Sequence, residues 1–228
     1  MDRVTRKQWD SAAARYDLLV RGPEIRWAEY KRTFFAPMQG KVLFLAAGTG
    51  LDFQFFPPNQ RVTAIDISPK MLEKAAPRAE QYDGTIDLKE MDVHDLRSPG
   101  SASFPDESFD QVFSVCTFCS VSNPVHGLEQ LRRVLKPGGQ LRMFEHTGSR
   151  WFPFNLMLNL MTPITRLSGP ELNRPTVENV ARAGFTVQRV NNLYLDVVKT
   201  IEAIRSQSAS DGSSVRAQSA SDGSAGEQ

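Results

Sequence analysis

The sequence is short of the residues that define several classes of protein. Only two of its 228 residues are cysteine, Cys116 and Cys119, so a disulfide framework is excluded. No run of about 18 apolar residues occurs, which excludes a membrane-spanning helix. Residues 1–7 carry charge without an apolar stretch, so a secretory signal is not expected. These absences predict a cytoplasmic protein without an integral membrane segment.

Neither sign of charge is in excess. The chain has 27 Lys and Arg against 26 Asp and Glu, which gives a formal net charge of +1. This balance argues against a nucleic-acid partner that is bound through bulk electrostatics. Hydrophobic residues make up 40% of the chain, which is enough for one core. We therefore expect a single domain over residues 1–204.

The segment from residue 205 to residue 228 has a different composition. The stretch Ser206–Ser213 returns almost unchanged at residues 217–224, and Val215 is the one large apolar residue in the segment. Such a polar repeat cannot bury enough apolar surface to offset the entropy that ordering it would cost. We predict a disordered tail rich in Ser, Ala and Gly.

Short apolar runs alternate with segments of helical spacing through most of the domain. Two helices are expected, one over residues 68–81 that begins at Ser68-Pro69 and one over residues 124–135 that ends at Lys136–Gly139. The expected strands are residues 41–46, 61–66, 85–91, 109–116 and 140–145. This alternation indicates a parallel sheet with helices on both faces.

The two ends of the domain depart from this alternation. Residues 3–35 predict two helices, part of an N-terminal cap that reaches to about residue 38. Residues 176–183 predict a helix that is followed by strands at 185–190 and 195–203. The connection at Asn191-Asn192 is too short for a parallel crossover, so this last pair must be antiparallel. The predicted fold class is α/β, with a seven-stranded, mostly parallel sheet and one antiparallel strand.

A glycine-containing turn follows the first expected strand. The apolar run Val42–Gly50 ends in Gly48-Thr49-Gly50, and Asp66 closes the next apolar run. Aligning the second glycine of a dinucleotide fingerprint with Gly48 puts Ala46 and Leu51 where the other two glycines belong. The turn therefore disfavours NAD, whereas Asp66 is suited to bind a ribose diol. A ligand with a ribose and no pyrophosphate fits better.

Five motifs, in order, resemble those of the class I S-adenosylmethionine-dependent methyltransferases. They are Val42–Gly50, Ile65–Leu72, Met91–Val93, Phe104–Asp110 and Leu131–Gly139. The resemblance covers roughly residues 9–203. It implies a Rossmann-like sheet, S-adenosylmethionine as the cofactor and methyl transfer as the activity.

Two groups within that family are the most similar. The quinone-biosynthesis and phospholipid N-methyltransferases resemble the chain at Trp9-Asp10 and Ala14–Asp17. A methyltransferase-like group that acts on alkyl thiols is similar at Phe55–Pro58, Cys116–Ser122 and Met143–His146. Both groups act on small or lipophilic molecules. The resemblance therefore implies a thiol, an amine, a phospholipid headgroup or a carbon acid as the methyl acceptor.

The resemblance also implies which residues bind the cofactor. Gly48 and Gly50 would face its methionine and ribose parts, and Asp66 would bind the ribose hydroxyls. Asp92 would hydrogen-bond the adenine amino group, and Tyr16 would close the pocket over the methionyl end. The full set of expected cofactor-binding residues is Tyr16, Ala46, Gly48, Gly50, Asp66, Ile67, Met71, Asp92, Val93 and Thr117. No metal site is expected.

Two positions depart from the family pattern. Phe44 stands where an Asp or Glu is usual, and Ala46 stands where a glycine is usual. The missing carboxylate removes a charge-assisted hydrogen bond to the methionine ammonium group, which is worth about 1.5–3 kcal/mol. Ala46 is tolerated in this close approach if its φ is negative. A methyltransferase-fold protein that binds the cofactor with lost or weak catalysis is therefore the alternative.

The acceptor side offers one candidate catalytic residue. His146 ends the fifth expected strand, at the edge where α/β sheets bind ligands, so it is the candidate acceptor-side base or orienting group. The alternative is a histidine that is only hydrogen-bonded at a strand end. Cys116 and Cys119 have the spacing of a zinc or redox pair, but the sequence lacks further ligands and places them after a strand. They are better explained as small residues of the cofactor wall.

The most apolar stretch, Trp151–Met161, directly follows the fifth expected strand. It predicts either core or a lid helix over the acceptor pocket, where Met157 and Met161 would adapt to a lipophilic acceptor. Clustered Lys and Arg, which a membrane-surface helix usually carries, are missing from this stretch. The lid is therefore favoured, and peripheral membrane contact stays open as an alternative.

Overall fold

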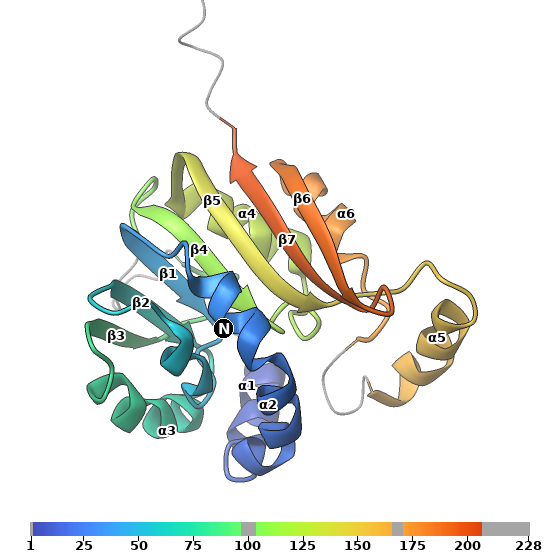
Figure 1. The fold of residues 1–228 in the computed structure, drawn as a ribbon, viewed down its shortest axis with the longest axis horizontal. Helices are drawn as coiled ribbons and strands as arrows, with labels where there is room; N and C mark the ends of the chain where they lie inside the picture. The colour runs from blue at the N-terminus through green and yellow to red at the C-terminus, as the bar shows by residue number, and fades with distance from the viewer. Residues whose placement is uncertain (1, 97–103, 166–170, 207–228) are drawn as a thin grey trace, which may run out of the picture.

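A single sheet forms the centre of the computed structural model, which describes residues 2–96, 104–165 and 171–206 (Figure 1). Its strand order is β3-β2-β1-β4-β5-β7-β6. All neighbouring strands are parallel except the two pairs that involve β7. The predicted fold class is confirmed. The strands are β1 Lys41–Leu45, β2 Arg61–Asp66, β3 Thr85–Glu90, β4 Phe109–Val115, β5 Leu135–His146, β6 Phe185–Tyr194 and β7 Val198–Arg205.

Helices flank the sheet at the positions that the capping residues predict. Ser68 Oγ accepts a hydrogen bond from the Met71 amide at the start of α3, and Asn123 Oδ1 accepts one from the His126 amide at the start of α4. Two helices also form in the N-terminal segment, as predicted. The helices are α1 Arg3–Ala12, α2 Tyr16–Phe35, the 3-10 helix η1 Leu51–Phe55, α3 Pro69–Glu80, α4 Pro124–Val134, α5 Phe154–Thr165 and α6 Thr176–Arg182.

Two hydrophobic clusters hold the layers together, one on each face of the sheet. Alternation along β1 shows the division, because Leu43 and Leu45 belong to one cluster and Phe44 to the other. The first cluster includes residues of α4 and α6, and the second includes residues of α2, η1 and α3. Helices therefore cover both faces of the sheet, and the carboxyl ends of the parallel strands lie between the two helical layers.

Two connections differ from the sequence-based expectation. β5 begins at Leu135 rather than at residue 140, because Leu135 already pairs with Phe109; the register then shifts, and the next pair is Gln111 with Gln140. The turn between β6 and β7 lies at residues 195–197 rather than at Asn191-Asn192. Those two asparagines pair with Thr200 and Lys199 inside the hairpin. Leu195 and Asp196 instead adopt the positive φ angles of a turn, at 48° and 56°.

The apolar segment that follows β5 does not join the core. It forms α5, which stands away from the sheet in Figure 1. Leu158 and Thr162 are buried, whereas Leu160 is 68% exposed and Phe152 is 80% exposed. The core alternative for this stretch is wrong, because too few of its side chains meet the rest of the molecule.

Two further expectations concern membrane-spanning helices and the C-terminal tail. Within the described residues, no helix combines the length and the apolar character that crossing a membrane requires. The predicted tail lies outside the described residues from position 207 onward, and Arg205 itself still belongs to β7.

Candidate functional site

A cavity lies at the carboxyl ends of β1, β2 and β4 and is covered by the N-terminal helices. Nine of the ten expected cofactor residues line it, and Gly50 is the exception. His146 is also absent from the cavity wall. The expected residues on the wall are Tyr16, Ala46, Gly48, Asp66, Ile67, Met71, Asp92, Val93 and Thr117.

Gly50 determines the backbone path of the glycine loop, residues 46–50, and does not line the cavity. Its φ is +81°, and a Cβ added to it would come within 2.7 Å of the Phe53 ring. Its amide donates to the carbonyl of Ala47, which tightens the turn into η1. Gly50 is therefore needed for the path of the backbone.

Ala46 and Gly48 are the loop residues that face the cavity. Ala46 has a φ of +50°, so the condition of a negative φ, under which its side chain would be tolerated, is not met. This left-handed conformation is uncommon for a residue with a side chain and costs on the order of 1 kcal/mol. Gly48 has a φ of +54°, and the nearest side-chain atom to an added Cβ is Tyr16 Cε1 at 3.9 Å. The backbone at Gly48 is open to the cavity.

Asp66 presents a buried carboxylate to the cavity at the end of β2. Its Oδ2 accepts a hydrogen bond from the Gly48 amide and its Oδ1 accepts one from the Ser68 amide, both at 2.8 Å. Burial raises the pKa of Asp66 against these two hydrogen bonds, and the charge of Asp10 adds to the rise. Asp66 ties the glycine loop to the start of α3 while one side stays on the cavity wall.

Asp92 is the second carboxylate on the wall, and its environment differs. Its Oδ1 accepts from the His94 amide at 2.9 Å and lies 2.8 Å from His94 Nδ1, while Oδ2 accepts from the Asp2 amide at 2.7 Å. Burial opposes ionisation of Asp92, but the hydrogen bonds from His94 and Asp2 lower its pKa to about 2. The hydrogen bond to Asp92 raises the pKa of His94 in turn. The carboxylate is ionised and fixed in place.

Glu145, near the end of β5, is a buried acid that the sequence reasoning missed. It is fully buried and accepts from Ser114 Oγ at 2.5 Å, from the Thr117 amide at 3.1 Å and from the Phe118 amide at 3.2 Å. Burial raises the pKa of Glu145 to about 7 despite these hydrogen bonds. Glu145 therefore holds the loop that carries Thr117 to the cavity. An acid at the carboxyl end of the expected strand over residues 140–145 was the available signal.

Both thiols of the chain lie near this loop and are free. Cys116 is accessible, and it lines the cavity. Burial and the charge of Glu145 raise the pKa of Cys119 to about 12. Among the described residues, no group of three His, Cys, Asp or Glu side chains is arranged to hold a metal ion.

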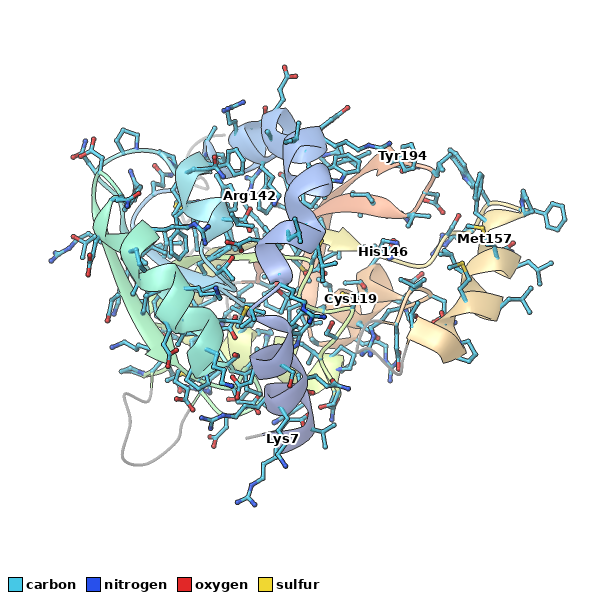
Figure 2. The ribbon with its side chains drawn as sticks, turned by 90° about the horizontal axis from the view of Figure 1, so that it is seen from below. Lys7, Cys119, Arg142, His146, Met157 and Tyr194 are labelled. Carbon is cyan, nitrogen blue, oxygen red and sulfur yellow. The ribbon has the colours of Figure 1, made fainter. Side chains whose placement is uncertain are left out.

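His146 lies at the carboxyl end of β5, between the N-terminal helices and α5 (Figure 2). Its Nδ1 is buried and has no hydrogen-bond partner in the described structure. Burial lowers the pKa of His146, which favours the neutral imidazole. The alternative for His146 was a histidine that is only hydrogen-bonded at a strand end. Within the described residues, its Nδ1 makes no such hydrogen bond.

Phe44 fills the position where the family usually has an acid. Its side chain is fully buried and makes edge-on contacts with Phe35, Phe53 and Phe56, at ring centroid distances of 5.9, 6.2 and 5.1 Å. The position therefore belongs to the aromatic core under α2 rather than to the cavity wall.

The N-terminal helices supply a cover that the sequence reasoning placed only in outline. Trp9 of α1 and Tyr16 of α2 both line the cavity and meet edge to face, with centroids 6.1 Å apart. Asp2 and Thr5 complete the contribution of this segment to the wall. By contrast, none of the described residues of α5 lines the cavity, so the structure does not bring the expected lid helix to it.

Comparison with known proteins identifies the family. A family model described as a methyltransferase domain matches residues 43–143. The human protein "Thiol S-methyltransferase TMT1A" is 30% identical over 182 residues, which cover 73% of this chain and 71% of that protein. The chain belongs to the class I S-adenosylmethionine-dependent methyltransferases.

Further relatives agree with this assignment. "Ubiquinone/menaquinone biosynthesis C-methyltransferase UbiE" from Geotalea daltonii is 31% identical over 160 residues, which cover 65% of each protein. Alignments with the first curated relatives span 50 to 65% of those proteins' own length. A putative methyltransferase solved with the Haloferax volcanii Trm112 activator has a TM-score of 0.67 at 18% identity. That match covers 90% of this methyltransferase chain and 98% of the solved one, and it supports the fold.

Proposed function

We propose that this chain transfers a methyl group from S-adenosylmethionine to a small or lipophilic acceptor. The observation that carries the proposal is the convergence of nine of the ten expected cofactor residues on one cavity. The ten residues come from five separate segments of the chain, and the fold brings nine of them to one wall. A concave site with a few polar groups on a largely apolar wall is typical of small-molecule binding.

The residues on the wall fit the cofactor. Each oxygen of the Asp66 carboxylate accepts one backbone amide, which leaves a lone pair on each for a ribose hydroxyl. Asp92 would face the adenine amino group, with Ile67 and Val93 beside the ring. Gly48 offers an open backbone and Tyr16 would cover the methionyl end.

When bound, S-adenosylmethionine supplies a methyl group that is already activated on a sulfonium. The work left for the chain is to orient the acceptor and to exclude water. Trp9 and Tyr16 cover the cavity, and Thr117, held by Glu145, would lie near the sulfonium.

His146 is our candidate for the acceptor-side base or orienting group. Burial holds its imidazole in the neutral form, which a general base requires. With His146→Gln we expect an unchanged dissociation constant for S-adenosylhomocysteine and a loss of turnover for acceptors that carry a proton. An unchanged kcat with such an acceptor between pH 6 and pH 9 would remove His146 from the reaction.

Calorimetric titration with S-adenosylhomocysteine, and with NADH as the control ligand, tests the cofactor. The acceptor is tested by measuring S-adenosylhomocysteine release with alkyl thiols, lipid amines and carbon acids. We give the thiols first place, because the relatives named thiol S-methyltransferases reach 38% identity. No binding at millimolar S-adenosylhomocysteine would refute the proposal.

The second candidate is a protein that binds the cofactor without turning it over. Phe44 and the left-handed Ala46 support it, because both depart from the family pattern: Phe44 leaves β1 without the usual acid, and Ala46 puts a side chain on the cavity wall where a glycine is usual. Tight binding of S-adenosylhomocysteine with no product from any acceptor class would favour this candidate over the enzyme.

A cytoplasmic location is part of the proposal, and the two free thiols are consistent with a reducing compartment. We also propose that the partners are small molecules and that nucleic acid is not bound. Peripheral contact of α5 with a membrane is left as the alternative for its exposed apolar side chains. Cell fractionation and a vesicle flotation assay check the location and the membrane contact.

A further inference from the structure

Three residues outside the cavity wall form a compact polar cluster behind the glycine loop. Asp17 comes from the first turn of α2, Thr49 from the loop and Arg78 from the last turn of α3. Thr49 Oγ1 donates to Asp17 Oδ1 at 2.5 Å, and Arg78 Nη2 bonds Asp17 Oδ2 at 2.7 Å. Arg78 Nη1 also donates to the Thr49 carbonyl at 2.6 Å. Each residue therefore contacts the other two.

The chemistry of the cluster depends on the guanidinium. One Arg78 side chain reaches a carboxylate and a backbone carbonyl at the same time, which the single ammonium of a lysine does not do in the same geometry. Thr49 is 1% exposed, so its groups need partners within the protein. The side chains of Arg78 and Asp17 are 35% and 40% exposed, so the ion pair alone contributes little.

The cluster is joined through the backbone to two residues of the cavity wall. Tyr16 directly precedes Asp17, and Gly48 directly precedes Thr49. Across the cavity, Tyr16 Cε1 lies 3.9 Å from the point where a Cβ on Gly48 would stand. Holding Asp17 against Thr49 therefore sets the spacing between the Tyr16 ring and the Gly48 backbone.

The loop needs such support because of its own conformation. Ala46 holds a positive φ at the start of the loop, and a residue in that region persists only where its surroundings fix it. We infer that the Asp17–Thr49–Arg78 cluster is a positioning device that couples the closure of Tyr16 over the cofactor to the conformation of the glycine loop. This inference rests on the proposed function, since it assigns the cluster to the same cofactor site.

The first test needs no cofactor. Amide hydrogen exchange of the full chain is compared between the wild type and Arg78→Met, with Arg61→Met as the matched control at an exposed position of β2. We expect Arg78→Met to speed exchange both in residues 12–19 and in residues 46–51, while Arg61→Met leaves both segments unchanged. Faster exchange in neither segment, or in one alone, would overturn the coupling.

The second test measures the dissociation constant of S-adenosylhomocysteine by calorimetry. Loss of the fixed loop is expected to raise it roughly tenfold in Arg78→Met, and Arg78→Lys should recover only part of this. Tyr16→Ala should also weaken binding, and the double variant should be weaker than wild type by less than the product of the two single effects. Melting temperatures confirm that each variant is folded.

The outcomes separate this inference from the proposed function. If the wild type binds S-adenosylhomocysteine and Arg78→Met binds it equally well, the positioning role is wrong and the proposed function stands. If the dissociation constant of the double variant rises by the product of the two single effects, Arg78 acts independently of Tyr16, and the inference is also overturned. If the wild type does not bind, the proposed function fails, and the cluster loses its role at a cofactor site.

Discussion

Asp66 and Glu145 are buried carboxylates that do different work. Asp66 lies on the cavity wall and accepts amides that fix the glycine loop, whereas Glu145 lies behind the wall and fixes the loop of Thr117. Both pKa values are raised by burial. Asp66 was expected from its place after an apolar run, but Glu145 was not, because its partners come from another strand.

Asp66→Asn tests the carboxylate at the cavity. An amide keeps one acceptor oxygen and puts an NH₂ group against either the Gly48 or the Ser68 amide. We expect the dissociation constant of S-adenosylhomocysteine to rise roughly tenfold to a hundredfold, the value of one charge-assisted hydrogen bond. Asp87→Asn, at an exposed position of β3, is the control and should bind like the wild type. Calorimetry gives both constants, and equal values would contradict the role of Asp66.

Glu145→Gln tests the pKa of the buried acid. Because the folded pKa of about 7 exceeds the ordinary value of 4.5, the folded state binds more protons than the unfolded state between these values. This group therefore makes the free energy of unfolding fall as the pH rises from 4.5 to 7. The glutamine variant lacks this contribution, so its stability relative to the wild type should increase over that range.

Urea unfolding of both proteins at pH 5 and at pH 7 gives the comparison. The raised pKa of His94 acts with the same sign near neutral pH, but it is common to both proteins and cancels. A stability difference that does not change with pH would show that Glu145 titrates normally.

At the scale of elements, α5 and the β6–β7 hairpin show where local patterns mislead. Asn191-Asn192 is a strong turn signal, yet both residues pair in the ladder and the turn forms at Leu195. The apolar character of Trp151–Met161 predicts burial, but α5 presents most of it to solvent. The spacing of apolar residues predicted that this helix and these strands exist. The register of the hairpin and the packing of α5 were not predicted, because they depend on contacts with residues distant in the sequence.

Few of the described side chains of α5 are buried against the rest of the molecule, so one substitution can test how the helix is held. Leu158 is 4% exposed, and among the side chains of α5 that the structure describes it is the large apolar one that is buried. Leu158→Ala should leave the melting temperature nearly unchanged and should speed proteolytic cleavage within residues 154–165. Leu160→Ala, at a position that is 68% exposed, is the matched control. If cleavage is equal in both variants, Leu158 does not anchor the helix.

At the scale of the whole molecule, the sheet and its two clusters follow from the sequence more directly than the site does. Alternating segments and the short C-terminal connection predicted all seven strands and the one reversed strand. The cofactor residues were predicted through the resemblance, and nine of them share one cavity. The sign of φ at Ala46 and the Asp17–Thr49–Arg78 cluster were not predicted, because they depend on how three elements pack together.

Phe44→Asp restores the acid that is usual in the family and tests whether the whole fold tolerates it. The side chain would lie among Phe35, Phe53 and Phe56, without a partner for its charge. We expect the free energy of unfolding to fall by at least about 3 kcal/mol, because an aromatic contact is lost and a charge is buried. Phe152→Asp, where the side chain is 80% exposed, should cost little. Urea unfolding decides, and a stable variant that binds the cofactor more tightly would refute this account.

The single reversed strand has a practical consequence. Since β7 runs against its neighbour, with His146 opposite Val198 and Gln140 opposite Ile204, the chain leaves the sheet at the edge farthest from the cavity. Arg205 therefore lies on the opposite side of the molecule from the cavity. A dye or a solid support attached to the side chain of a residue at this end of β7 would leave the mouth of the cavity unobstructed, so this end is suited to immobilising the molecule.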